Sequence, residues 1–208
     1  MKQKAQTEVI SLVLISGIVI GLVGVAYMWG IPLISKRTAV TDFLAAEDFV
    51  VKLNDKIVDI ANSGSGEATL TIPKGLIKVI SYGSNDPKNN SLILEVVINQ
   101  PLILGNSVVL KTNVLGENAT YGEAEPRIIN LSSQSYGSDY KLSFSLHFRE
   151  LDTRNEPLKG YLIAVQQGTV TGTSRVVISY AGTEVNPSGR RAMNGGNLIL
   201  TKIKVDLM

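Results

Sequence analysis

Hydrophobic residues form first an unbroken run and then a regular spacing along the N-terminal part of the chain. No charged residue occurs in the segment Val9–Ser35, and such a run can cross a hydrocarbon layer, which needs about 20 apolar residues in a helix. Farther on, apolar residues recur at steps of three or four as far as Ile60, which is the period of an amphipathic helix. The pattern predicts a long helix from about Thr7 to Ile60, apolar on all sides in its first half and on one face in its second half.

Individual residues mark the middle and the end of this helix. Pro32 removes one backbone donor, so a kink is expected near it. Tyr27 and Trp29 stand near the outer end of the apolar run, where amphipathic rings favour the headgroup zone of a membrane. The glycines of the segment Asn62–Gly66 predict the helix end, because glycine readily adopts the left-handed conformation found there. The chain is therefore divided into an apolar helix at 6–34, an amphipathic continuation at 35–62 and a β-rich domain at 63–208.

Short runs with β-type alternation follow Gly66. The clearest is Lys141–Arg149, where leucine and phenylalanine alternate with polar residues, so that one face is core and the other meets solvent. No long helical pattern separates the runs, which predicts an α+β fold with an antiparallel β-sandwich or barrel-like domain rather than a parallel α/β sheet. The predicted strands are Ala68–Ile72, Leu76–Tyr82, Leu92–Ile98, Ser107–Lys111, Lys141–Arg149, Gly160–Gln166, Arg175–Tyr180 and Leu198–Leu207.

The composition excludes several classes of protein. Lys and Arg total 20 against 18 Asp and Glu, a balance too even for a protein whose main partner is nucleic acid. No cysteine is present, which excludes disulfides, thiolate metal sites and thiol nucleophiles. The apolar run is longer than the core of a secretory signal peptide, about 7–15 residues, and lacks the small-residue cleavage site that follows one. A membrane anchor is therefore expected, and a cofactor is not.

A short basic motif precedes the apolar run. The segment Lys4–Ile10, KAQTEVI, leads directly into the helix and resembles the class III signal sequence of archaeal type IV pilin-like proteins. The resemblance implies that a prepilin peptidase removes leader residues 1–5, with Ala5 the last leader residue and Gln6 the new N-terminus. It also implies that Glu8 is the acidic residue at the helix start, and that the helix packs in a filament core below a β-rich head.

Physical chemistry adds a reason for assembly. Removal of the leader leaves an amine at the start of an apolar helix, and Glu8 would neutralise it, because an unpaired charge in a low-dielectric bundle is costly. Gly17, Gly21 and Gly24 would let neighbouring helix backbones approach closely. Simpler interpretations stay open, since Thr7 and Glu8 could cap a membrane helix and glycine is common in membrane helices.

Three Asn-X-Ser/Thr sequons lie in predicted loops or at their edges, at Asn89, Asn118 and Asn130. They would permit N-glycosylation of an exported domain. Chance also produces such triplets in a chain rich in Asn, Ser and Thr.

No residues form a recognisable catalytic framework. His147, the only histidine, is predicted on the polar face of its strand, and a lone surface histidine makes a poor metal site or triad. The acidic residues of the predicted loops indicate solvated side chains rather than an acid/base pair; they are Glu123, Glu125, Asp152 and Glu156. The chain is not expected to be an enzyme.

The leading hypothesis is a structural subunit of a surface filament. It would be a homo-oligomer held together by its N-terminal helix, with the β domain exposed for adhesion. The N-terminus would be cytoplasmic before processing, and the partners would be the prepilin peptidase, the pilus assembly machinery and the membrane. The alternative is a single-pass protein that stays uncleaved and presents its β domain to a ligand; a surface hydrolase, the third class, would need a clustered site.

Overall fold

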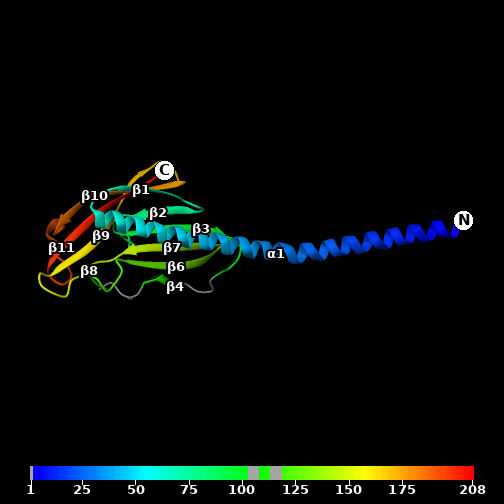
Figure 1. Ribbon diagram of the computed structural model, residues 1–208, viewed down its shortest axis with the longest axis horizontal. Coiled ribbons are helices and arrows are strands. Elements are labelled where there is room, and N and C mark those ends of the chain that lie inside the picture. Colours follow the sequence, from blue (N-terminus) through cyan, green and yellow to red (C-terminus); the bar gives the residue numbers. More distant parts are fainter. Residues whose placement is uncertain (1, 103–107, 113–118) are drawn as a thin grey trace.

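The computed structural model describes residues 2–102, 108–112 and 119–208, with the side chains of residues 2–10 and 111 outside that description. This part of the chain forms one long helix and two β-sheets (Figure 1). The helix projects from a β-rich head, so that the N-terminus lies far from the head and the C-terminus lies within it. The α+β class predicted from the sequence is confirmed.

The helix α1, Lys2–Ser63, is continuous and passes through Pro32. It begins at Lys2 rather than near Thr7, so it is longer than expected. Its end matches the prediction, because the N–H of Gly64, a residue at φ 64°, donates to the carbonyl of Ile60 at 3.1 Å. Glycine adopts this left-handed conformation without a steric penalty. The kink expected near Pro32 remains a prediction.

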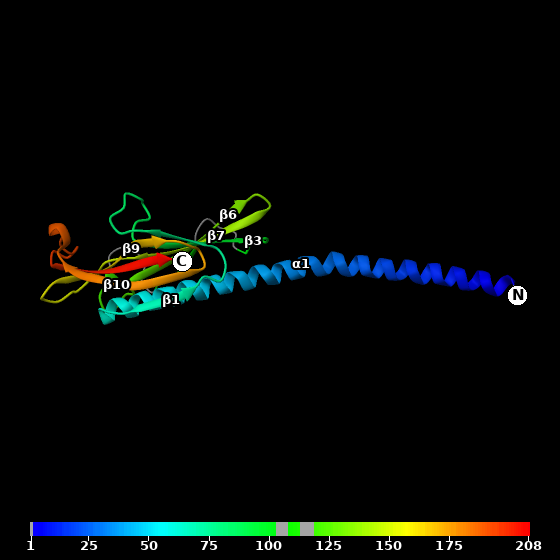
Figure 2. The same cartoon turned by 90° about the horizontal axis from the view of Figure 1, so that it is seen from above.

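The second half of α1 is held by the head. Seen from above, it runs along one side of the two sheets (Figure 2). Its buried apolar residues follow the predicted helical spacing and face both sheets; they are Ala39, Ala46, Phe49, Val50, Leu53, Ile57 and Ile60.

The described strands form a six-stranded sheet in the order β1-β10-β11-β9-β8-β5 and a five-stranded sheet in the order β2-β3-β7-β6-β4. The six-stranded sheet contains β1 (Glu67–Thr71), β10 (Arg175–Val185), β11 (Asn197–Leu207), β9 (Lys159–Val170), β8 (Leu151–Asp152) and β5 (Ala119–Thr120). The five-stranded sheet contains β2 (Leu76–Ile80), β3 (Ser91–Ile98), β7 (Asp139–Phe148), β6 (Arg127–Tyr136) and β4 (Val108–Lys111). A short 3-10 helix, η1 (Pro187–Gly189), lies in the loop between β10 and β11. Each strand predicted from the sequence overlaps one of the strands of these two sheets.

The expectation of purely antiparallel sheets is wrong for the six-stranded sheet. There β11 runs parallel to β9, and β5 runs parallel to β8. The cause of the first parallel pair is that β11 forms a hairpin with β10 and inserts between β10 and β9. The turn from β9 to β10 passes over the end of β11, where the N–H of Thr171 donates to the carbonyl of Leu207 at 2.8 Å. The five-stranded sheet is antiparallel throughout its described strands.

One hydrophobic core joins α1 to both sheets. In β7 the predicted alternation is confirmed, since Leu142, Phe144, Leu146 and Phe148 are all buried. The ring of Phe144 lies 5.7 Å from that of Phe43 on α1, measured between centroids. The core therefore fixes the second half of α1 against the head and leaves its first half without a covering.

Candidate assembly interface

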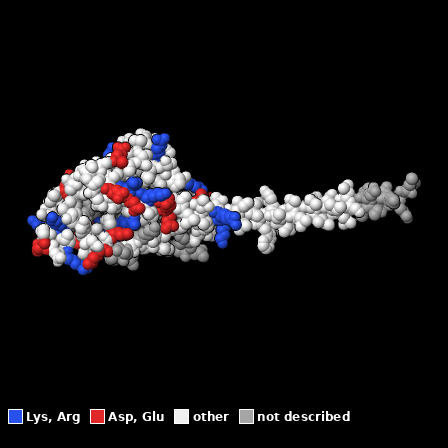
Figure 3. Space-filling view, viewed as in Figure 1, with Lys and Arg blue, Asp and Glu red and all other residues white. Residues whose placement is uncertain are grey.

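The apolar rod, residues 11–35 of α1, is exposed on every side. Its large apolar side chains keep between 47% of their surface exposed, at Ile31, and 80%, at Trp29. A helix of a soluble protein normally buries one apolar stripe, as the second half of α1 does. Figure 3 shows no charged side chain on the described part of the rod, whereas the head carries both basic and acidic side chains. The fold of the described residues therefore leaves the apolar surface of the rod uncovered.

Leaving the rod in water has a high cost. Burial of one large apolar side chain is favourable by about 1.5–3 kcal/mol, so transfer of the whole rod out of water would be favourable by on the order of 20–40 kcal/mol. The segment of α1 from Ser11 is long and apolar enough to cross a membrane by its length and composition, with a mean hydropathy of 2.3 in its most apolar window. The rod therefore has the length and the composition of a membrane-spanning helix.

The glycines Gly17, Gly21 and Gly24 lie together on one face of the rod. At about 100° of rotation per residue, they fall within an arc of about 60°. A Cβ atom added at any of them would meet no atom within 4 Å beyond the adjacent helix backbone. This face is therefore a smooth strip along which another helix backbone could approach closely.

Aromatic and basic residues mark the end of the rod nearest the head. Tyr27 and Trp29 are 69% and 80% exposed, and the next charged residues, Lys36 and Arg37, are exposed as well. Aromatic rings followed by basic side chains are typical of the boundary between the hydrocarbon layer and water. This end of the rod therefore has the residue pattern of such a boundary.

The residues implied in processing lie at the start of α1. Ala5 and Gln6 are within its first turns, while the side chain of Glu8 lies outside the described side chains, so its charge pairing stays a prediction. Thr7 lies inside α1, not at its first residue. The interpretation of Thr7 as the N-cap is therefore wrong, because the helix extends five residues further towards the N-terminus, to Lys2.

The sequons occupy different environments. Asn89 is half-buried in the loop before β3, and Ser91 of the same triplet is buried. Asn130 does not lie in a loop: it is within β6, opposite Ser145 of β7. Its neighbours Ile129 and Leu131 point into the core, which places Asn130 on the outer face because side chains alternate along a strand. Asn118 lies outside the described residues.

A partly buried polar network, which no sequence pattern signals, ties the loop between β10 and β11 to the head. The carboxylate of Glu150 accepts a hydrogen bond from Arg190 at 3.0 Å and another from the N–H of Met193 at 2.6 Å. The guanidinium of Arg190 lies 5.7 Å from the ring centroid of Tyr82. Burial, together with the nearby charge of Glu150, raises the pKa of Asp152 above its ordinary value. Glu150, Arg190 and the N–H of Met193 satisfy one another and hold the loop in place. The Oδ1 atom of Asp152 is buried and has no hydrogen-bond partner among the described residues, so the expectation of a solvated side chain is wrong for Asp152.

No metal site is present within the residues that the structure describes, where no three His, Asp or Glu side chains gather. His147 lies half-buried on the outer side of β7, as its alternation predicts. It borders a cavity of about 310 Å³ together with Glu150 and Arg190. Glu150 and Arg190, which also line this cavity, are paired with each other at 3.0 Å.

Comparison with protein-family models, with curated proteins and with solved structures gives no match to this chain. Its function must therefore be argued from the rod and the head themselves.

Proposed function

We propose that this chain is the structural subunit of a type IV pilus-like surface filament, assembled through its apolar rod and displaying its β-rich head. The observation that carries the proposal is the exposure of the rod on every side, together with the burial of the second half of the same helix. A rod that is apolar all round is suited to an environment without water on any side. A membrane supplies that environment first, and a bundle of identical rods supplies it in the filament.

The leader motif and the glycine face support a bundle of copies over a permanent anchor. Cleavage between Ala5 and Gln6 would remove Lys2 and Lys4 and so free the rod from its charged cytoplasmic end. Glu8 would then pair with the new amine of its own or a neighbouring subunit. The face formed by Gly17, Gly21 and Gly24 has the space that close helix contacts need.

The shape of the chain suits this role. A kink near Pro32 would set the angle between rod and head, and the head would form a β-sandwich packed on the second half of α1. Adhesion or other surface contacts would then be made by the heads, outside the filament core. Prepilin peptidase and the pilus assembly machinery would be the partners that process and extract the subunit.

The mass of the native N-terminus tests processing. Co-expression with a prepilin peptidase should give a chain that begins at Gln6, and Ala5→Leu should block cleavage because the peptidase requires a small residue there. Gln3→Ala, inside the leader but away from the cut, is the matched control and should be processed normally. A native chain that retains Met1 would point instead to the second candidate, an uncleaved single-pass protein that presents its head to a ligand.

Electron microscopy of the cell surface tests assembly. Deletion of the gene should remove a filament, and the processed chain should restore it. Cells whose surface is unchanged by the deletion would contradict the filament and favour the single-pass anchor.

A further inference from the structure

Two tyrosine rings from distant parts of the chain stack beside each other at the end of the head farthest from the N-terminus. Tyr121 follows β5 and Tyr161 lies in β9, and their ring centroids are 4.6 Å apart with planes tilted by 32°. The short strand β8 joins them, because Leu151 pairs with Ala119 on one side and with Tyr161 on the other. Tyr121 is 55% exposed. Neither ring belongs to the hydrophobic clusters that the described residues form, so core packing does not account for them.

The rings separate two adjoining hollows. One is a polar cavity of about 450 Å³ and the other is a less polar groove of about 640 Å³ beside the end of α1, and both are lined by Tyr121 and Tyr161. Ligand sites in proteins commonly have volumes of about 300–1,000 Å³ and combine aromatic walls with a few placed polar groups. We call the two hollows and the rings between them the tyrosine cleft.

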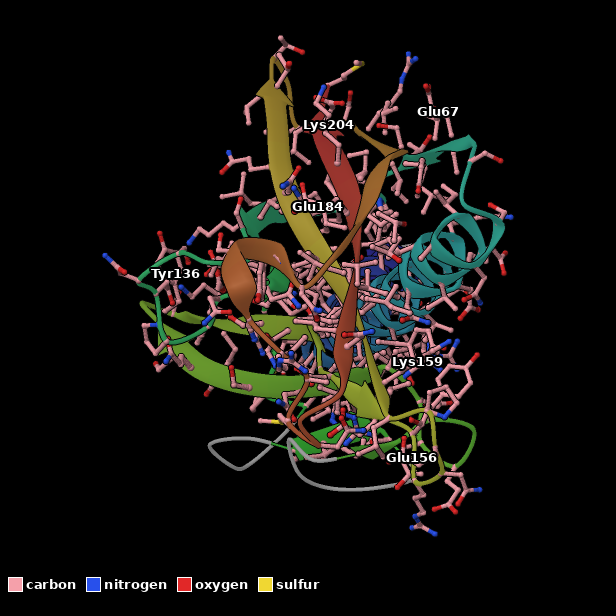
Figure 4. The ribbon with its side chains drawn as sticks, turned by 90° about the vertical axis from the view of Figure 1, so that its left-hand side faces the viewer. Glu67, Tyr136, Glu156, Lys159, Glu184 and Lys204 are labelled. Carbon is pink, nitrogen blue, oxygen red and sulfur yellow. The ribbon has the colours of Figure 1, made fainter. Side chains whose placement is uncertain are left out.

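The polar side of the cleft carries balanced charge. Its charged side chains are Glu123, Arg154, Glu156 and Lys159, which gives two negative and two positive groups. Glu123 and Arg154 are held together at 2.8 Å, and Glu156 accepts a hydrogen bond from the N–H of Leu158 at 3.3 Å. Figure 4 looks onto this end of the head, where Lys159 lies between Glu156 and the end of α1. The cleft therefore offers both donors and acceptors without a net charge.

This combination selects one class of ligand. An anion such as phosphate would need an excess of basic groups, and a lipid tail or apolar helix would need an apolar lining. A neutral sugar has hydroxyl groups that both donate and accept, and it has C–H faces that pack on the negative face of an aromatic ring. We propose that the tyrosine cleft binds a neutral oligosaccharide, stacked on Tyr121 and hydrogen-bonded by the surrounding charged and amide side chains.

The position of the cleft gives the binding a use. The start of β9 and the end of α1, whose residues line the cleft, lie at the end of the head opposite the rod (Figure 1), so the cleft would face outward when the rod is covered. The inference rests on the proposed function in this one respect, that the head is displayed to the surroundings. Binding itself needs no filament.

Calorimetric titration of the full-length chain tests the proposal. The chain is kept in micelles of a zwitterionic detergent, because sugar-based detergents would compete for the cleft. The probes are the neutral hexasaccharides cellohexaose and chitohexaose, and a sulfated hexasaccharide is the charged comparison. At least one neutral probe should bind, with an affinity that changes little with salt, because screening affects mainly ionic contacts.

Variants locate the site. Tyr121→Ala should weaken binding about ten-fold or more, whereas Tyr121→Phe, which keeps the ring, should stay within about three-fold. Tyr136→Ala is the matched control, because Tyr136 is 61% exposed but lies on the β6–β7 hairpin, away from Glu156 in Figure 4. Asn155→Ala, an exposed change in the same cleft, should weaken binding several-fold even if Tyr121→Ala fails to fold.

Several outcomes would overturn the proposal. One is that neither neutral probe binds. Another is that only the sulfated probe binds and that this binding is lost at high salt. A third is that Tyr136→Ala and Tyr121→Ala weaken sugar binding equally. A change of oligomeric mass in Tyr121→Ala without a change in sugar binding would assign the cleft to a second copy of the chain instead. The titration uses the unassembled chain. An absence of sugar binding would therefore not contradict the filament proposal, and an absence of filaments would not affect the test of sugar binding.

Discussion

The side-chain carbonyl of Asn90 accepts a hydrogen bond from the backbone N–H of Val165 at 2.8 Å, which joins the loop before β3 to a central part of β9. The amide group of the same side chain donates to the carbonyls of Phe148 at 2.9 Å and Ile163 at 2.8 Å. Asn90 is 2% exposed. A single buried amide therefore links the two sheets, and its position at φ 57° suits asparagine, which tolerates the left-handed conformation better than most residues.

Replacement of Asn90 by alanine should therefore destabilise the head by about 2–4 kcal/mol, because buried backbone groups on both sheets lose their partner. Asn90→Gly, which relieves the left-handed backbone, should recover about 1 kcal/mol of this. Denaturant unfolding of the full chain in micelles measures both. Asn89→Ala, at the half-buried neighbour, is the control and should stay within about 0.5 kcal/mol of the parent chain.

The contact between α1 and the head makes a separate prediction. Leu53 is 2% exposed at the centre of the shared core, so Leu53→Ala should cost about 2–5 kcal/mol through lost burial and the cavity left behind. Lys52→Ala removes only an exposed pair with Asp48 at 2.7 Å, which should cost less than about 1 kcal/mol. Equal effects of the two changes on the unfolding midpoint would contradict a core that includes α1.

The glycine face predicts an effect on assembly without an effect on the subunit. A Cβ atom added at Gly21 meets no atom within 4 Å beyond the adjacent helix backbone, and the rod lies away from the head, so with Gly21→Leu the head should unfold at an unchanged denaturant concentration. In a bundle the added side chain would hold neighbouring helices apart, and filaments seen by electron microscopy should be lost or shortened. Gly30→Leu is the matched control, since it is equally open but about 180° around the helix from Gly21. Normal filaments with Gly21→Leu would show that this face is not the packing face.

The carboxyl group of Asp152 predicts a dependence of stability on pH. Its pKa is raised from the ordinary 3.8, first by burial and then by the nearby charge of Glu150. A raised pKa in the folded state means that the folded head binds the proton more tightly than the unfolded chain does. The stability contribution is therefore complete below pH 3.8 and is lost as the pH rises through the folded value.

Asp152→Asn should remove this loss, so the variant should gain stability over the parent chain at neutral pH and lose the advantage in acid. Unfolding curves measured from acid to neutral pH test the direction of this change.

The carboxyl group of Glu95 predicts the opposite dependence of stability on pH. Burial opposes its charge, but Lys78 and Lys141 outweigh burial and lower its pKa. Its contribution is present above pH 4.5 and disappears as the pH falls, so Glu95→Gln should cost stability only at the higher pH.

The sequence predicts best those features that a single short segment decides. The burial stripe of α1 and the alternation in β7 follow from the spacing of apolar residues, and Gly64 ends the helix for a conformational reason that is local to it. Strand β6 was missed because its second half, Ser132–Ser135, is polar, and because only Ile129 and Leu131 are buried in it. The partner strand β7 supplies the pairing that these residues do not signal on their own.

Features that join distant segments were not predictable from one sequence. The tyrosine cleft brings together Tyr121 and Tyr161 through the two-residue strand β8, and no periodicity marks so short a strand. Asn90 binds backbone groups far along the chain, and its role as the middle residue of a sequon gave no sign of this. The start of α1 at Lys2 was also missed, because the expected cap at Thr7 carried a local preference that the longer helix overrides.

The central place of β11 between β9 and β10 sets an order of events during synthesis. The ribosome makes β11 after every other strand of its sheet, so β9 and β10 wait with unpaired edges until residues 197–207 emerge. By then the rod has long left the exit tunnel and can already be inserted in lipid. In the membrane-anchored subunit proposed above, insertion of the rod would therefore precede closure of the head, and a stalled or truncated chain would be anchored while its open strand edges remained free to aggregate.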